Sequence, residues 1–134
     1  MDWLLPKYKK VGFEDMLSHL YSKKCIIINT LSSHEQGCLI SNTIQMNDEE
    51  RAINEMIDKY ENKVIIIYGK NSIDESVEKK YKQLIQLGLN VYIYTGGLFE
   101  WILLQDIYGE TNFPTTTKIT DLLIYRPLKN PQLT

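Results

Sequence analysis

The sequence has 134 residues, enough for one compact domain that buries most of its apolar surface. Hydrophobic residues make up 43% and charged residues 24%, a balance that excludes a largely disordered chain. The formal net charge is −2 and the basic residues are scattered, so we expect neither nucleic acid nor a membrane surface as a partner.

The cysteines and the N-terminus indicate a cytoplasmic protein. Cys25 and Cys38 belong to no C-x-x-C or Cys/His pattern, so we expect a reducing compartment, no metal and no cofactor. Trp3 lies in a short apolar stretch that Asp2 and Pro6 interrupt, too short for a signal peptide or a membrane span. Trp3 either folds back onto the domain or serves as an exposed anchor for another protein.

Short β-branched runs alternate with amphipathic stretches, which predicts crossover units on a parallel sheet. Helical spacing of apolar residues predicts a helix over residues 13–21. The continuous apolar run of residues 25–29 predicts a strand covered on both faces. Residues 31–41 have the composition of a loop, and residues 42–45 predict a further short strand.

The middle of the chain begins with a helix over residues 47–60. Asn47 and Glu50 have the spacing of a capping box at its start. Residues 64–68 (VIIIY) form the clearest strand prediction in the sequence. A third helix is expected over residues 74–87.

Glycines punctuate the last part of the chain. Gly88 occupies the position of a left-handed C-cap after the third helix. A strand over residues 91–94 is followed by a Gly-Gly pair and a helix that ends at Gly109. Residues 120–125 predict a last helical turn.

These elements predict an α/β fold in three layers, with a small parallel sheet of about five strands flanked by helices. The predicted organisation is an N-terminal segment (residues 1–10), one domain (residues 11–126) and a C-terminal tail (residues 127–134).

The connection after the clearest strand is the expected place for a ligand, because parallel sheets bind ligands beyond the carboxyl ends of their strands. Residues 69–74 (GKNSID) form this connection. Backbone N–H groups at a strand-to-helix junction can cradle an anion. Every such unit has a connection here, so the position alone does not define a chemistry.

Four segments carry a family resemblance by their order and spacing: residues 26–30 (IIINT), 37–42 (GCLISN), 65–68 (IIIY) and 91–101 (VYIYTGGLFEW). Together they resemble a rhodanese homology domain over about residues 11–125. The segments WILLQDIYG (101–109) and FPTT (113–116) resemble a subgroup found in protists and large DNA viruses.

The resemblance implies which positions would carry chemistry. Active rhodaneses place a sulfur-carrying cysteine directly after the central strand and an arginine five residues later. In this chain those positions hold Gly69 and Asp74. Glycine has no atom on which a persulfide can form, and an aspartate repels an anionic sulfur donor. We therefore expect no catalytic residue and a vestigial active-site loop made of Gly69, Lys70, Asn71, Ser72, Ile73 and Asp74.

A helix-capping role explains the same loop. Ser72 and Glu75 have the spacing of a capping box, with Ser72 as the N-cap. Asp74 in the first turn stabilises a helix N-terminus by roughly 0.3–1 kcal/mol. The loop amides would then be satisfied by the protein's own side chains, and we favour this interpretation over a repurposed active site.

The resemblance therefore implies a catalytically inactive rhodanese-like domain that acts as a protein-binding or regulatory module, with another protein as its partner. One alternative is a divergent sulfurtransferase in which Cys38, if exposed, carries the sulfur. A second alternative is an anion-binding domain that uses the loop amides and Lys70. The oligomeric state is left open.

Overall fold

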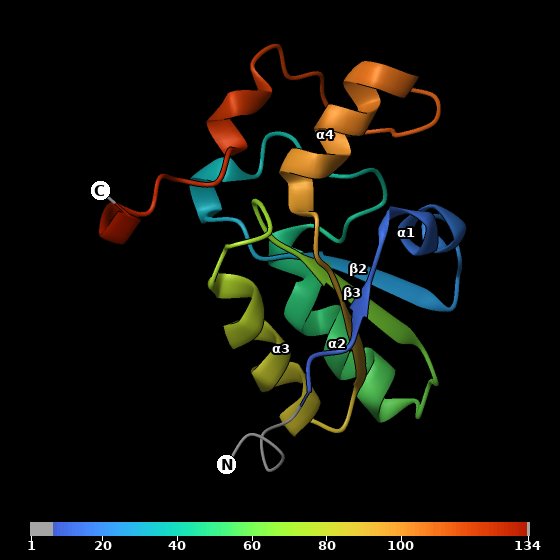
Figure 1. Cartoon of the computed structure of the whole chain (residues 1–134). Helices are drawn as coiled ribbons and strands as arrows, with labels where there is room; N and C mark the ends of the chain where they lie inside the picture. The colour runs from blue at the N-terminus through green and yellow to red at the C-terminus, as the bar shows by residue number, and fades with distance from the viewer. Residues whose placement is uncertain (1–6, 134) are drawn as a thin grey trace.

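The computed structural model describes residues 7–133, which form a helix–sheet–helix sandwich (Figure 1). Among these residues the sheet has four parallel strands in the order β1-β4-β3-β2. The strands are β1 (Lys10–Val11), β2 (Cys25–Asn29), β3 (Val64–Tyr68) and β4 (Asn90–Tyr94). β3 lies between β2 and β4, so its carboxyl end opens at the middle of the sheet edge.

Each face of the sheet is covered by two helices. α1 (Phe13–His19) and α4 (Gly97–Tyr108) pack on one face, and α2 (Glu49–Asp58) and α3 (Ser76–Gln86) pack on the other. β3 shows why both faces are needed, because Ile66 and Tyr68 join one core and Ile65 and Ile67 join the other. The predicted three-layer α/β fold is confirmed.

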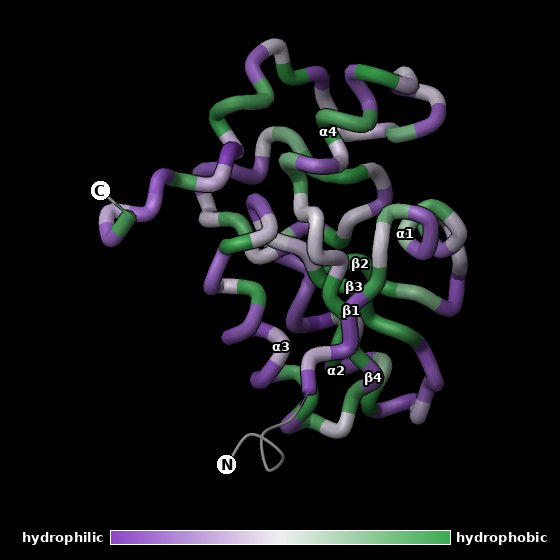
Figure 2. Tube along the Cα trace, in the orientation of Figure 1, coloured by the Kyte–Doolittle hydropathy of each residue, from purple (hydrophilic) through white to green (hydrophobic). Residues whose placement is uncertain are grey.

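Hydropathy follows this arrangement (Figure 2). Apolar residues run along the central strands, and polar residues lie on the outer surfaces of α2 and α3. Within residues 7–133 no helix has the length and apolarity to cross a membrane.

Short 3-10 helices fill the connections of the fold. They are η2 (Ser33–Glu35), η3 (Met46–Asp48), η4 (Leu122–Tyr125) and η5 (Pro131–Leu133). The predicted last helical turn is thus confirmed as η4.

The sheet differs from the expected five strands at two places. Residues 42–45 do not form a strand: Thr43 makes a single bridge with Ile27, because Asn42 has a left-handed backbone (φ 67°) that turns the chain away. Conversely, β1 pairs with β4 and begins at Lys10, inside the predicted N-terminal segment. Two residues are too few to give a periodic signal in the sequence.

The ends of the helices differ from the sequence predictions more than the positions of the helices do. α1 stops at His19, and Tyr21 beyond it is exposed. The capping box expected from Asn47 and Glu50 is absent, because η3 leads into α2 and leaves the N-cap Asp48 in a helical conformation without a side-chain cap. Gly88 does have the predicted left-handed conformation (φ 79°).

Candidate functional site

The connection between β3 and α3, residues 69–74 (the 69–74 loop), is held against the start of α4. The N–H of Leu98 donates to the Gly69 carbonyl (2.9 Å), and the N–H of Phe99 donates to the Lys70 carbonyl (2.9 Å). Gly97 permits this contact, since it has φ 67° and a Cβ there would lie 2.8 Å from the Gly69 oxygen. The Gly-Gly pair seen in the sequence therefore serves a close backbone approach.

The space above Gly69 is filled. A Cβ on this residue would collide with Cγ2 of Val77 and would lie 2.6 Å from Oδ2 of Asp74. Val77 is a buried residue in the first turn of α3. A side chain at position 69 therefore has no room while Val77 and Asp74 keep their places.

Asp74 places its carboxylate on the loop amides. Its Oδ2 accepts a hydrogen bond from the N–H of Lys70 (2.8 Å). Its Oδ1 accepts from the N–H of Ser76 (3.0 Å) and from the Ser76 hydroxyl (2.7 Å). The Ser76 hydroxyl also lies 2.8 Å from that of Thr30, which follows β2. The anion at this helix start is thus part of the protein.

The capping box expected from Ser72 and Glu75 is not formed. Glu75 is itself at the N-cap in a helical conformation without a side-chain cap, so α3 begins at Ser76 and not at residue 74. Ser72 is exposed, and nothing in the described part of the chain bonds its side chain. The protein's own side chains do satisfy loop amides as expected, but the acceptor is Asp74 and not Ser72, and the donors are the N–H groups of Lys70 and Ser76.

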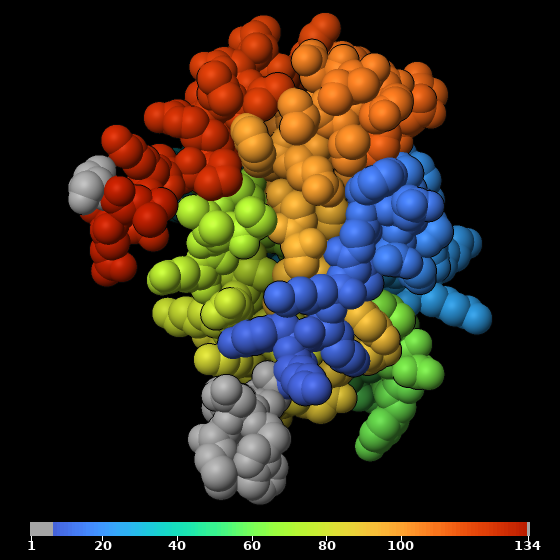
Figure 3. All heavy atoms as spheres, in the orientation of Figure 1, coloured from blue at the N-terminus to red at the C-terminus, as the bar shows by residue number. Residues whose placement is uncertain are grey.

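Asn71 connects the loop to the C-terminal part of the chain. It is buried; its Oδ1 accepts from the N–H of Ile73 (3.1 Å), and its Nδ2 donates to the Tyr125 carbonyl (3.0 Å). Figure 3 shows the loop region, in yellow-green, lying against the C-terminal segment, in red. η4 and the residues after it thus complete the surroundings of the loop.

Lys70 forms an ion pair with a carboxylate on the neighbouring connection. Its Nζ lies 2.6 Å from Oε2 of Glu35 in η2, and the Ser32 hydroxyl donates to the other oxygen (2.7 Å). The hydrogen bond from Lys70 lowers the pKa of Glu35 below its ordinary value. The charge that the sequence offered for an external anion is therefore neutralised within the protein.

A cavity of about 430 Å³, the loop-mouth cavity, opens above the loop. Its apolar lining residues are Leu31, Ile73, Ile124 and Leu128. Its charged lining residues are Glu35, Lys70, Asp74 and Arg126.

Sequence reasoning identified the loop but missed the residues that complete it. Ile124, Arg126 and Leu128 reach the loop-mouth cavity from the end of the chain, and Val77 closes the space above Gly69. The available signal was slight: residues 124–128 overlap the end of the last predicted helical turn and combine apolar residues with an arginine.

Neither cysteine lines the loop-mouth cavity, and both are buried. Cys38 is only 2% exposed, and its thiol donates to the Thr117 carbonyl (3.4 Å). Cys25 is buried at the start of β2, and burial raises the pKa of its thiol to about 11. Trp3, the other residue singled out in the sequence, lies outside the described residues. Within those residues, no cluster of three or more His, Cys, Asp or Glu side chains could hold a metal.

Solved structures with the same fold come from several organisms. The BH2092 protein from Bacillus halodurans is 18% identical with a TM-score of 0.59, over 75% of this chain and 74% of that one. A full-length protein from Lactobacillus plantarum is 16% identical with a TM-score of 0.61, over 81% and 88%. The As-Sb reductase from Leishmania major is 17% identical with a TM-score of 0.54, over 78% and 81%. At these identities the similarity shows the fold alone.

No curated protein matches the chain significantly. The profile of the rhodanese-like domain matches residues 14–104, more than half of the chain. The chain therefore belongs to the rhodanese-like domain family.

Proposed function

We propose that this rhodanese-like domain does not transfer sulfur and acts by binding another protein. The observation that carries the first half is the filled space above Gly69, which Val77 and Asp74 occupy. The family resemblance assigns the sulfur-carrying cysteine to this position. Glycine supplies no thiol for a persulfide, and the surroundings leave no room for one.

The carboxylate of Asp74 argues against an anion-binding role. It accepts the hydrogen bonds from the N–H groups of Lys70 and Ser76 that a bound anion would need. A second anion at this place would lose those donors and would be repelled by the carboxylate. The anion-binding alternative is therefore the weaker one.

Burial of Cys38 argues against the other alternative. A sulfur carrier must meet a donor and then an acceptor, so its thiol has to reach solvent. The Cys38 thiol is buried and donates to the Thr117 carbonyl. Sulfur transfer through Cys38 would need this part of the core to open.

Exposed apolar side chains support the protein-binding half of the proposal. Ile73, Ile124 and Leu128 are 59%, 54% and 73% exposed, and all three line the loop-mouth cavity. Water-exposed apolar side chains gathered at one hollow are typical of an interaction site. A regulatory role, and a place in the protist and DNA-virus subgroup, stay predictions of the sequence.

A thiosulfate-to-cyanide transfer assay tests the proposal. We expect the wild-type chain to form no thiocyanate above the enzyme-free rate, beside an active rhodanese as positive control. Cys38→Ser is the matched variant. Thiocyanate formation by the wild type that disappears in Cys38→Ser would overturn the proposal in favour of the divergent sulfurtransferase.

A further inference from the structure

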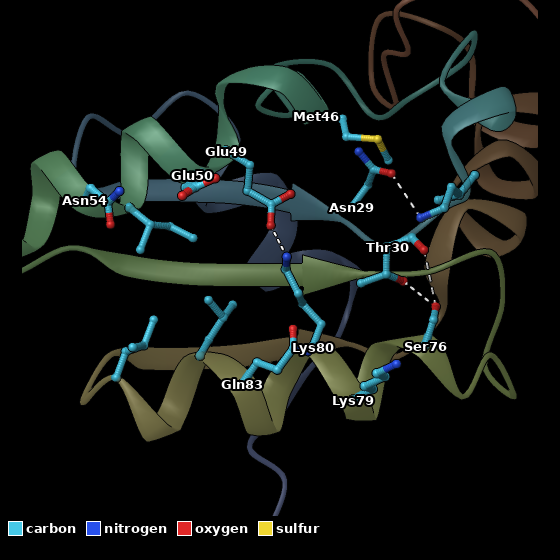
Figure 4. Close-up of a pocket in the computed structure, with 14 residues that line it drawn as sticks. Asn29, Thr30, Met46, Glu49, Glu50, Asn54, Ser76, Lys79, Lys80 and Gln83 are labelled. Atoms are coloured by element: carbon cyan, nitrogen blue, oxygen red, sulfur yellow. Dashed lines mark hydrogen bonds and ion pairs between the residues drawn. The ribbon is translucent and has the colours of Figure 1, made fainter.

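A second hollow lies next to the loop-mouth cavity. This second hollow, of about 690 Å³, lies between α2 and α3 and is lined on both sides by side chains of these helices (Figure 4). Thr30, Leu31 and Ser76 line both hollows, so the two lie side by side at the carboxyl end of β2. In Figure 4 the second hollow extends from Thr30 and Ser76 at one end to Asn54 at the other. We call these two adjacent hollows together the groove; side by side they offer more length than one side chain needs and suit an extended ligand.

The two ends of the groove differ in polarity. Between α2 and α3 the lining is mixed: Lys80 forms an ion pair with Glu49 across the hollow (Figure 4), and Ile53, Leu84 and Leu87 also line it. At the loop mouth the exposed apolar side chains are Ile73, Ile124 and Leu128. An apolar side chain placed there would remove these residues from water, whereas the α2–α3 end offers hydrogen bonds to a backbone.

One charge at the loop mouth is unmatched. Lys70 is paired with Glu35, and both carboxylate oxygens of Asp74 accept hydrogen bonds within the loop. The Arg126 guanidinium donates from Nη1 to the Leu123 carbonyl (2.9 Å). Within residues 7–133 no carboxylate forms an ion pair with Arg126. A guanidinium with donors left over favours a carboxylate as its complement.

We propose that the groove binds an extended segment of another protein, which inserts an apolar side chain into the loop-mouth cavity and presents a carboxylate to Arg126. The inference rests on the proposed protein-binding function and specifies its site and the chemistry of the partner. The carboxylate comes from an Asp or Glu of the partner beside its apolar residue, or from the partner's own C-terminus.

Selection from a phage-displayed library of random linear peptides on the full chain tests this inference. We expect the selected peptides to share a large apolar residue next to an acidic one. The affinity of a synthetic selected peptide is then measured by fluorescence polarisation. Arg126→Glu should weaken it at least about tenfold, because an attractive charge-assisted contact becomes repulsive.

Matched variants separate the groove from general surface effects. Arg51→Glu changes the other arginine, which is exposed on α2 and paired with Asp48, and should leave peptide affinity unchanged. Ile73→Asp should abolish binding, whereas Ile107→Asp, at a 63% exposed isoleucine on α4, should not. The circular dichroism spectrum of each variant should match that of the wild type, which checks that the variant is folded.

The outcomes distinguish this inference from the proposed function. Selected peptides without acidic residues, or an affinity that Arg126→Glu and Ile73→Asp leave intact, overturn the groove inference but not protein binding. Failure to select any peptide also contradicts the groove inference. Sulfur transfer by the wild-type chain, in contrast, contradicts the proposed function itself.

Discussion

The base and the mouth of the 69–74 loop differ in how their surfaces are covered. At the base, Gly69 is packed under Val77 and Asp74, and the start of α4 closes on its carbonyl through Gly97. At the mouth, Ile73 and Ile124 remain more than half exposed around a cavity. The comparison teaches that one loop can be tightly packed at its base and still leave apolar side chains exposed at its mouth.

Gly97→Ala should give the largest effect at the base. Its Cβ would lie 2.8 Å from the Gly69 oxygen and 2.9 Å from the Asn71 nitrogen, in a residue that already has φ 67°. Backbone atoms cannot move aside as a side chain can, so we expect the free energy of unfolding in urea to fall by about 3 kcal/mol or more.

Gly88→Ala is the matched control for this variant. Gly88 also has a left-handed backbone, but a Cβ there would meet nothing within 4 Å. We expect a loss of about 1 kcal/mol from backbone strain alone. Equal losses of stability in Gly97→Ala and Gly88→Ala would show that α4 does not approach the loop closely enough for a Cβ at Gly97 to collide with it.

Gly69→Ala should destabilise the chain by about 2 kcal/mol, because a Cβ meets Val77 and Asp74 in a filled space. Val77→Ala alone should also be destabilising, since it removes buried methyl groups. In the double variant the two losses should not add, and urea unfolding should give a favourable coupling of about 1 kcal/mol. Simple additivity would mean that Val77 does not block position 69.

Asp74→Ala should lower stability by about 1–2 kcal/mol, because the N–H groups of Lys70 and Ser76 lose their carboxylate acceptor. Ser72→Ala should change stability by less than about 0.5 kcal/mol, since its hydroxyl is exposed. Thermal unfolding of both variants compares the observed cap with the one expected from sequence. A larger loss of stability from Ser72→Ala than from Asp74→Ala would show that Ser72, and not Asp74, caps the loop amides.

Lys70→Met should have a small effect, because the ion pair of Lys70 with Glu35 near the loop mouth is partly exposed. The pKa of Glu35 is lowered in the folded chain, so the pair stabilises the protein above the ordinary pKa of 4.5 and this contribution disappears as the pH falls through the folded pKa. At neutral pH we expect a loss below about 0.5 kcal/mol. Carboxyl NMR titration should show the Glu35 pKa rising in the variant; an unchanged pKa would exclude the ion pair in solution.

The sequence predicts the layers well because burial leaves a periodic signal. The continuous apolar run of β3 places Ile65 and Ile66 on opposite covered faces, and the left-handed Gly88 follows from the absence of a side chain. The single bridge at Thr43 could not be predicted, since the backbone of Asn42 decides it and not the apolar pattern.

The site was predictable only in part for a related reason. Ser72 and Asp74 both suit a helix start by residue type, and only the path of the loop decides which side chain reaches the amides. Arg126 comes to the loop mouth because the Asn71 amide holds the Tyr125 carbonyl, a contact between segments far apart in the chain. No local pattern encodes such a contact.

The most direct test of the account is the intact mass of the wild-type chain after incubation with thiosulfate, before and after cyanide. We predict no gain in mass, because Gly69 carries no thiol and both Cys25 and Cys38 are buried. A gain equal to the mass of one sulfur atom, which cyanide then removes, would contradict the claim that this loop has lost sulfur chemistry.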